Sequence, residues 1–194
     1  MMRLIDRLGG LDKARILLGS DVQIGGLPEA PPNRTFGYRF HTDWTKLPIE
    51  ILGKYGAAVG GADTLRFDGA NDFIMGYILN HAHERHIIIE GFMISCSPRY
   101  WEELYPKFPH LGIHSQYLFL NTPWDECLRR FTARRNGEMN AATEKATEQK
   151  FRQINKHFER MMEVGISPRW IPSDLGVEDF LIDLLRESEK CSSI

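Results

Sequence analysis

The stretch His86-Ile87-Ile88-Ile89-Glu90-Gly91 predicts a buried strand that ends in a carboxylate and turns at a glycine. The apolar run in this stretch is too short for a helix. Both faces of the predicted strand are apolar, as in strands that are covered on two sides. Helical patterns precede it at 71–84 and follow it at 98–105 and 123–135, and residues 115–121 form a second apolar run of strand length. This alternation predicts an α/β fold, with a three-layer α/β/α arrangement around a mainly parallel sheet.

The two ends of the chain extend this pattern. Residues 1–10 are typical of a short amphipathic helix that ends at two glycines. Residues 15–18 form a weaker strand candidate, and 169–172 form another. The apolar positions between 177 and 185 share one helical face, so we expect the chain to close with a strand followed by a helix.

The composition is that of an ordinary globular protein, with 194 residues, 42% hydrophobic and 26% charged. This length suits a single domain, 1–194. The net charge of −2 provides no overall basic field for a nucleic acid or a membrane surface. Glycine and proline gather in 19–61, which is expected to be loop-rich, whereas 124–160 contains no proline and is expected to be helical.

The sequence carries no signal for a membrane or for a disulfide framework. No apolar run approaches the roughly 18 residues of a membrane span, and residues 1–7 lack the apolar core of a signal peptide. We therefore expect a cytoplasmic protein with no membrane partner. The three cysteines, Cys96, Cys127 and Cys191, are odd in number and lack C-x-x-C spacing, which argues against disulfides and against a cysteine zinc site.

Glu90 is the first candidate for chemistry. Ligands of open parallel sheets bind outside the carboxyl ends of the strands, where the predicted strand places this residue. A carboxylate there can hold Mg²⁺ directly or through water, or accept a proton from a substrate hydroxyl. The alternative is a strand-end acid that caps the next helix or is simply solvated.

The second candidate is an arginine-rich helix that follows the 115–121 strand through Thr122-Pro123. Arg130 and Arg134 are four residues apart and so share a face, a pattern that suits the oxygens of a polyphosphate. Residues 124–160 hold nine basic and six acidic residues, a balance of +3. The alternative is a solvated helix end whose arginines complement the helix dipole and pair with acids of its first turn.

Together these motifs resemble the P-loop nucleoside and nucleotide kinase superfamily, which includes kinase-like proteins of bacterial viruses. The resemblance covers roughly residues 60–190 and rests on two features. The first is the order strand-Glu-Gly, helix, strand, and the second is the motif Thr-Pro-x-x-x-Cys-x-x-Arg-x-x-x-Arg-Arg, followed by a long helix, a strand and a final helix. It implies ATP and Mg²⁺ as cofactors, with Glu90 as the metal or catalytic carboxylate. It also implies that 124–160 is a lid whose Arg130, Arg134 and Arg135 close on the ATP phosphates.

The family's phosphate cradle, G-x-x-x-x-G-K-[ST], does not occur in this sequence. The only Gly-Lys pair, Gly53-Lys54, lacks the leading glycine, and the glycine-rich segment 19–26 lacks a lysine. In such kinases a helix like that predicted for 1–10 follows the cradle directly. We therefore expect that the chain begins just after its Walker A loop, that the first strand and loop are missing, and that ATP chemistry is absent or impaired.

The resemblance also implies a substrate side in 19–61. Asp43 is a candidate base for a substrate hydroxyl, and Phe40 or Trp44 is a candidate to stack on a nucleobase. Arg66 is a candidate for binding a substrate phosphate. The alternatives are that the aromatic residues pack in the core and that Arg66 pairs with a neighbouring acid.

Three functions stay open. The first is phosphotransfer from ATP to a hydroxyl of a nucleoside, a nucleotide or a modified base, and a homodimer is compatible with it. The second is a kinase-derived binding or assembly module without ATP chemistry, which would place the 15–18 strand beside the Glu90 strand. The third is a DNA-base hydroxyl kinase of a bacterial virus, with a basic surface that continues to Lys145, Lys150, Arg152 and Lys156.

Overall fold

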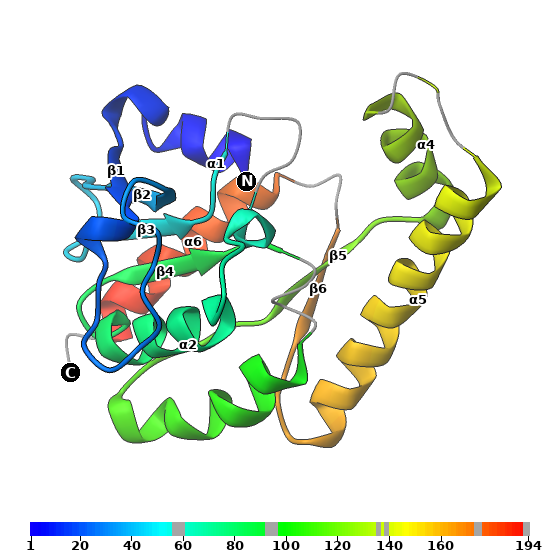
Figure 1. The fold of residues 1–194 in the computed structure, drawn as a ribbon. Coiled ribbons are helices and arrows are strands. Elements are labelled where there is room, and N and C mark those ends of the chain that lie inside the picture. The colour runs from blue at the N-terminus through cyan, green and yellow to red at the C-terminus, as the bar shows by residue number, and fades with distance from the viewer. Residues whose placement is uncertain (56–60, 92–96, 135–136, 138–139, 173–175, 192–194) are drawn as a thin grey trace. The chain divides into compact units, whose positions relative to one another are not determined.

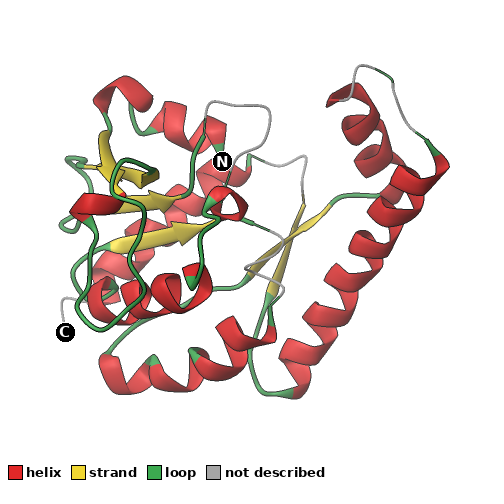
Figure 2. Ribbon diagram, viewed as in Figure 1, coloured by secondary structure: helices red, strands yellow, loops and turns green. Residues whose placement is uncertain are grey.

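The computed structural model describes all residues except 56–60, 92–96, 135–136, 138–139, 173–175 and 192–194 (Figure 1). The chain divides into two compact units. The first contains residues 1–114 together with 178–194, and the second contains residues 115–177. Helices and strands occur in both units (Figure 2), so the mixed α/β class expected from the sequence is confirmed. None of the described helices is both long and apolar enough to cross a membrane.

The first unit is built on a four-stranded sheet with the order β1-β2-β3-β4. The strands are β1 (Arg15–Leu18), β2 (Thr35–Phe40), β3 (Ile49–Leu52) and β4 (His86–Ile89). β1 pairs with β2 and β2 with β3 in antiparallel fashion, whereas β3 and β4 are parallel. The sheet is therefore mixed and not mainly parallel, because β2 and β3 are joined by a short connection that reverses the chain.

The described residues of this unit form the α-helices α1 (Met2–Arg7), α2 (Ala70–His81) and α6 (Val177–Cys191), the last from residue 178 onward. Shorter helical turns connect the elements. They are the 3₁₀ segments η1 (Leu11–Lys13), η2 (Gly19–Asp21), η3 (Ala62–Thr64), η5 (Tyr105–Lys107) and η6 (Pro109–Leu111), and the π-helical turn η4 (Arg99–Glu103).

Helices cover both faces of this sheet. On one face Leu52, Ile87 and Ile89 pack with the buried residues of α2, which include Phe73. On the other face α1 and α6 pack against buried side chains of β2 and β3. That second cluster contains Leu4, Ile5, Leu8, Tyr38, Phe40, Ile49, Ile51, Tyr55, Ile182 and Leu185. The apolar faces predicted for 1–10 and for 177–185 are thus the faces that bury against the sheet.

A β-bulge sends one aromatic ring to the α2 face. Leu17 pairs with Gly37 but Leu18 pairs with Thr35, so Phe36 has no partner on β1. The Phe36 ring instead meets the rings of Phe73 and Tyr77 at centroid distances of 5.3 and 5.1 Å. This edge-to-face packing anchors α2 to β2.

The second unit contains a two-stranded parallel sheet, β5 (Leu118–Asn121) and β6 (Arg169–Pro172), and two helices, α4 (Trp124–Arg134) and α5 (Ala141–Glu163). Aromatic side chains tie α5 to the strands. Phe158 of α5 stacks on Trp170 at 4.8 Å and meets Phe119 edge-on at 5.3 Å. The N-terminus of α5 is capped by Asn140, whose side chain accepts a hydrogen bond from the backbone of Thr143.

The strands expected at 15–18, 86–90, 115–121 and 169–172 are all present. The strands β2 and β3 were not predicted, since they lie inside the segment 19–61 that the glycine and proline content marked as loop. Their signal is nevertheless visible in the sequence. Alternate aromatic residues in β2 and the apolar run of β3 both follow strand patterns.

Candidate functional site

Glu90 follows the last residue of β4 and is exposed. Because β3 and β4 are parallel, their carboxyl ends lie at the same edge of the sheet, and the segment that follows β3 emerges there beside Glu90. Ligands of α/β sheets bind at the edge formed by these carboxyl ends. The sequence therefore placed Glu90 correctly at the carboxyl end of a parallel strand.

The segment after β3 folds back over this edge. Lys54 and Gly61 form an isolated antiparallel bridge, and the Thr64 hydroxyl accepts a hydrogen bond from the Lys54 backbone at 2.9 Å while donating to the Gly61 carbonyl at 2.6 Å. The backbone N–H of Ala62 donates to the Glu90 carbonyl at 2.7 Å. The turn η3 is thereby fixed next to Glu90.

Two glycines permit this close approach. Gly61 has φ +90°, and a Cβ there would lie 2.5 Å from the Glu90 carbonyl oxygen. A Cβ at Gly91 would lie 2.6 Å from an Asp63 carboxylate oxygen. Only a residue without a side chain fits at either point, and the Asp63 carboxylate consequently lies against the backbone that follows Glu90.

Tyr55 completes the group, and we call Tyr55, Asp63 and Glu90 the edge cluster. Tyr55 is 6% exposed, and its backbone N–H and carbonyl both interact with the Tyr38 hydroxyl. Burial raises the pKa of Tyr55 above its usual range, and the nearby carboxylates of Glu90 and Asp63 raise the pKa further. The Tyr55 hydroxyl therefore stays protonated, and it donates to the Leu52 carbonyl at 3.5 Å.

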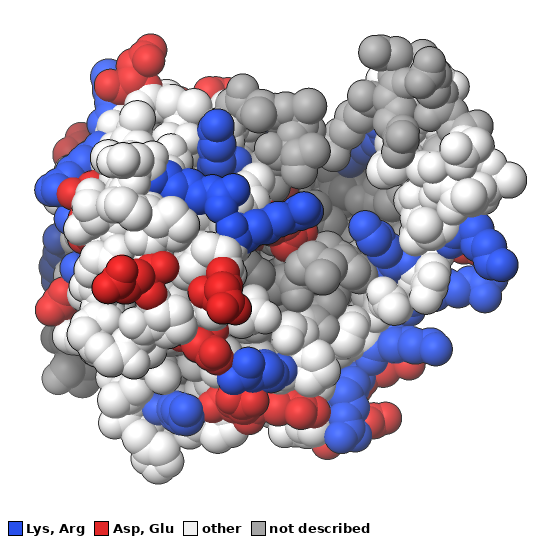
Figure 3. All heavy atoms as spheres, in the orientation of Figure 1, with Lys and Arg blue, Asp and Glu red and all other residues white. Residues whose placement is uncertain are grey.

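Basic side chains surround the edge cluster. Arg66 is exposed, and its Nε donates to the Asp63 carbonyl at 3.1 Å. Arg34 in turn donates to the Arg66 carbonyl, and Lys54 is exposed nearby in the chain. On the face drawn in Figure 3, Lys and Arg side chains of the first unit gather around the ends of β3 and η3. Two carboxylates with basic neighbours can hold both a cation and an anionic group.

The donor set fits a hydrated Mg²⁺ ion. Mg²⁺ is usually held by one or two carboxylates and keeps several water molecules, and Asp63 and Glu90 supply two carboxylates. Within the described part of the chain no group of three His, Cys, Asp or Glu residues could hold a metal. The described residues therefore form no metal site made of three or more of these side chains.

The arginine helix α4 is engaged in internal ion pairs. Glu126 accepts hydrogen bonds from Arg129 at 2.6 and 2.8 Å and from Arg130 at 2.5 Å. The hydrogen bonds from Arg129 and then Arg130 lower the pKa of Glu126 to about 2. This pairing is the alternative that the sequence left open for Arg130. The side chain of Arg134 and all of Arg135 lie outside the described residues.

Arg130 and Glu90 belong to different compact units, the second and the first. The functional pairing of these two residues therefore stays a prediction from the sequence.

The residues predicted on the substrate side do not gather around Glu90. β2 runs antiparallel to β3, so Asp43 and Trp44, which follow β2, lie at the edge where β3 and β4 begin. Glu90 lies at the opposite edge, one strand length or about 13 Å away. Phe40 is 1% exposed and packs in the core, and Arg186 of α6 lies over the Trp44 ring, 5.3 Å from its centroid. Of these candidates only Arg66 lies beside the edge cluster.

Sequence reasoning missed a second charged group, centred on Glu50. Glu50 is completely buried on β3, where Arg39 binds it at 2.6 Å, Arg85 at 2.9 Å and the Tyr77 hydroxyl at 2.7 Å. Burial raises the pKa of Tyr77, and the hydrogen bond to Glu50 raises it further. The one available signal was an acid inside the apolar run Ile49–Leu52, which requires a buried partner of opposite charge. This group joins β2, β3, α2 and the start of β4.

The histidines near β4 contact two different acids. His81 packs on Tyr77 with ring centroids 4.6 Å apart and lies 3.7 Å from Glu84. The exposed His83 lies 3.4 Å from the same Glu84. The Nε2 of His86 is instead 2.9 Å from a Glu189 carboxylate oxygen.

Comparisons with known proteins give no further guide to this chain. A scan against family models, a search of curated proteins and a search of solved structures each found no match. The function is therefore proposed from residues, contacts and the resemblance of the sequence motifs.

Proposed function

We propose that the protein is a Mg²⁺-dependent phosphotransferase of the P-loop kinase type, which transfers phosphate from ATP to a hydroxyl of a nucleoside, a nucleotide or a nucleic-acid base. The observation that carries the proposal is the edge cluster. Glu90 stands at the carboxyl end of a parallel strand, with the Asp63 carboxylate and the Tyr55 hydroxyl beside it.

Each member of the cluster has a role in this proposal. Glu90 binds Mg²⁺ or one of its water molecules, and the protonated hydroxyl of Tyr55 lies close enough to orient the Glu90 carboxylate. Asp63 takes the role that the sequence gave to Asp43 and orients the attacking hydroxyl, because Asp43 lies at the opposite edge of the sheet. Arg66 binds an anionic group of the substrate. Mg²⁺ supplies charge stabilisation for the transferred phosphoryl group.

The arginine helix contributes charge in the same proposal. Arg130 and Arg134 bind ATP phosphates, with Arg135 as a third contact, as the family resemblance implies. Arg130 is 45% exposed in its ion pair with Glu126. A guanidinium has five N–H donors, and Arg130 gives its Nε–H to Glu126, so its other donors can bind a phosphate oxygen.

The position of β1 supports this function over a kinase-derived binding module. The module interpretation expects the strand 15–18 beside the Glu90 strand. β1 and β4 are instead the two outermost strands of the sheet, with β2 and β3 between them. Among the described residues of the first unit, β4 pairs with β3 alone.

Calorimetric titration of Mg²⁺-ATP tests the proposal. Because this sequence lacks the glycine-rich cradle and its lysine, we expect weak binding by the chain itself. An added N-terminal segment that supplies a strand and a G-x-x-x-x-G-K-[ST] loop should tighten binding by at least about tenfold. Equal, undetectable binding by both proteins contradicts the kinase proposal.

A kinase that acts on a base within DNA is the same proposal with the substrate restricted to DNA. α5 carries the basic residues Lys145, Lys150, Arg152 and Lys156, of which Arg152 already pairs with Glu148 at 2.6 Å. DNA binding through such residues should weaken steeply as the salt concentration rises. Salt-independent DNA binding, or none, limits the substrate to a nucleoside or nucleotide.

A further inference from the structure

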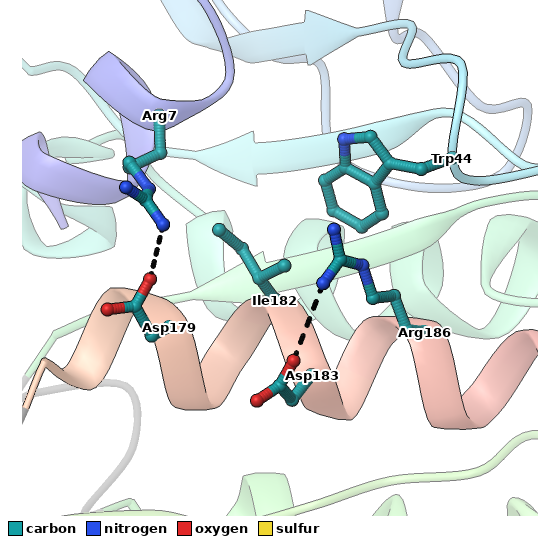
Figure 4. A pocket seen from close by; sticks show the side chains of 6 residues that line it. All are labelled: Arg7, Trp44, Asp179, Ile182, Asp183 and Arg186. Carbon is teal, nitrogen blue, oxygen red and sulfur yellow. Dashed lines mark hydrogen bonds and ion pairs between the residues drawn. The ribbon is translucent and has the colours of Figure 1, made fainter.

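A cavity of about 380 Å³ lies in the first unit between α1, the loop after β2 and α6 (Figure 4). Its lining is formed by Arg7, Trp44, Asp179, Ile182, Asp183 and Arg186. The loop that carries Trp44 is at the edge of the sheet where β3 and β4 begin. The cavity is therefore separate from the edge cluster, and the inference drawn from it does not rest on the proposed function.

Two apolar side chains line the cavity between its charged groups. Ile182 is 8% exposed and lies between the two ion pairs in Figure 4, and the half-buried Trp44 indole forms one side. The Arg186 guanidinium is held over the indole, 5.3 Å from the ring centroid. Such a surface favours a planar apolar group.

The rim carries both signs of charge with unused hydrogen-bonding capacity. Arg7 of α1 donates to Asp179 at 2.5 Å, which is its one hydrogen bond among the described residues. Arg186 and Asp183 are 3.6 Å apart, an ion pair without a hydrogen bond. Since a guanidinium has five N–H donors and a carboxylate accepts about four hydrogen bonds, both Arg186 and Asp183 can bind a further polar group.

The charge balance determines the kind of ligand. The lining holds two guanidinium groups and two carboxylates, so a ligand with only negative charge meets two carboxylates and one with only positive charge meets two guanidinium groups. A zwitterion satisfies both signs at once. The ammonium and carboxylate of an α-amino acid sit on the same carbon, a spacing that matches the adjacent charges of Arg186 and Asp183.

We propose that this cavity binds a free α-amino acid with an aromatic side chain. Its carboxylate binds Arg186, its ammonium binds Asp183, and its ring lies on Ile182 next to the Trp44 indole. The pair Arg7–Asp179, which is already hydrogen-bonded, closes the other end of the cavity.

Calorimetric titration with L-phenylalanine tests this site, and phenethylamine and 3-phenylpropionate provide matched ligands that lack the carboxylate or the ammonium. We expect saturable binding of L-phenylalanine and at least about tenfold weaker binding of both analogues. Equal binding of phenethylamine, equal binding of 3-phenylpropionate, or no saturable binding of L-phenylalanine overturns the proposal.

Two cavity variants and two control variants locate the binding. Asp183→Asn and Arg186→Gln change exposed side chains and should each weaken L-phenylalanine binding by about tenfold, whereas Arg152→Gln removes a comparable exposed ion pair on α5 and should not. Glu90→Gln should leave the affinity unchanged, which separates this site from the proposed phosphotransfer. Unchanged binding by both cavity variants contradicts the assignment.

Discussion

At the scale of single residues, the buried Glu50 shows how strongly one carboxylate can tie a fold together. It accepts hydrogen bonds from Arg39, Arg85 and Tyr77, which come from three different elements or their ends. Arg39 and Arg85 are only 21% and 14% exposed. The loss of Glu50 therefore leaves the partly buried Arg39 without its carboxylate, and leaves Arg85 with Glu84 alone, at 3.0 Å.

The variant Glu50→Gln should destabilise the protein by about 3 kcal/mol, the lower end of the range for breaking a buried ion pair, because both arginines keep some access to water. Urea unfolding measures this change. The control Glu148→Gln breaks an exposed pair with Arg152 and should cost about 0–1 kcal/mol. Equal stability of the two variants contradicts the role given to Glu50.

Glu189 provides a pH-dependent contact at the same scale. Burial by itself would raise the pKa of this carboxyl, but hydrogen bonds from His86 and from the backbone N–H groups of Leu47 and Lys46 outweigh it and lower the pKa. A group with a lowered folded-state pKa contributes stability above its unfolded pKa, near 4.3, and loses it as the pH falls. This contact holds α6 to β4 and to the start of β3.

The free energy of unfolding should therefore fall less between pH 7 and pH 4 for Glu189→Gln than for the parent protein. Urea unfolding at both pH values measures the difference. Glu187→Gln, which changes an exposed side chain of the same helix, should keep the parent's pH dependence. An unchanged pH dependence in Glu189→Gln shows that this carboxyl does not contribute.

At the scale of elements, the strands with the plainest apolar runs could be predicted from the sequence, and so could the helices with one apolar face. β4, β6 and α1 follow from local patterns of a few residues. β2 and β3 could not be predicted in this way, because the glycine and proline residues around them indicated loops more strongly than their own residue patterns indicated strands. The bulge at Phe36 depends on pairing with β1, which local sequence does not reveal.

Gly61 fixes the turn that brings η3 to Glu90, and Gly61→Ala tests this arrangement. A residue with a side chain at φ +90° is strained, and the new Cβ would lie 2.5 Å from a backbone oxygen. We expect a loss of about 1–3 kcal/mol in urea unfolding. Gly25→Ala, where a Cβ meets nothing within 4 Å, should change stability by less than about 1 kcal/mol. Equal effects of the two variants contradict the need for glycine at 61.

At the scale of the whole molecule, the candidate site was only partly predictable. Glu90 could be placed because a strand end is a local feature, and Arg66 was a candidate for the same region. Tyr55 and Asp63 reach Glu90 only through the folded-back segment after β3, so their proximity depends on tertiary structure. The position of Asp43 and Trp44 at the end of the strands opposite Glu90 could not be predicted, because β2 was not predicted and its direction decides where they lie.

The central claim is that Glu90 in the edge cluster supports Mg²⁺-dependent nucleotide binding. Its most direct test is the affinity for ATP with and without Mg²⁺, measured by calorimetry for the parent protein, Glu90→Gln and the control Glu187→Gln. We predict that Mg²⁺ tightens ATP binding by about tenfold in the parent and the control, and that Glu90→Gln abolishes this gain. An affinity that is the same with and without Mg²⁺ in the parent, or a full Mg²⁺ effect in Glu90→Gln, would contradict the claim.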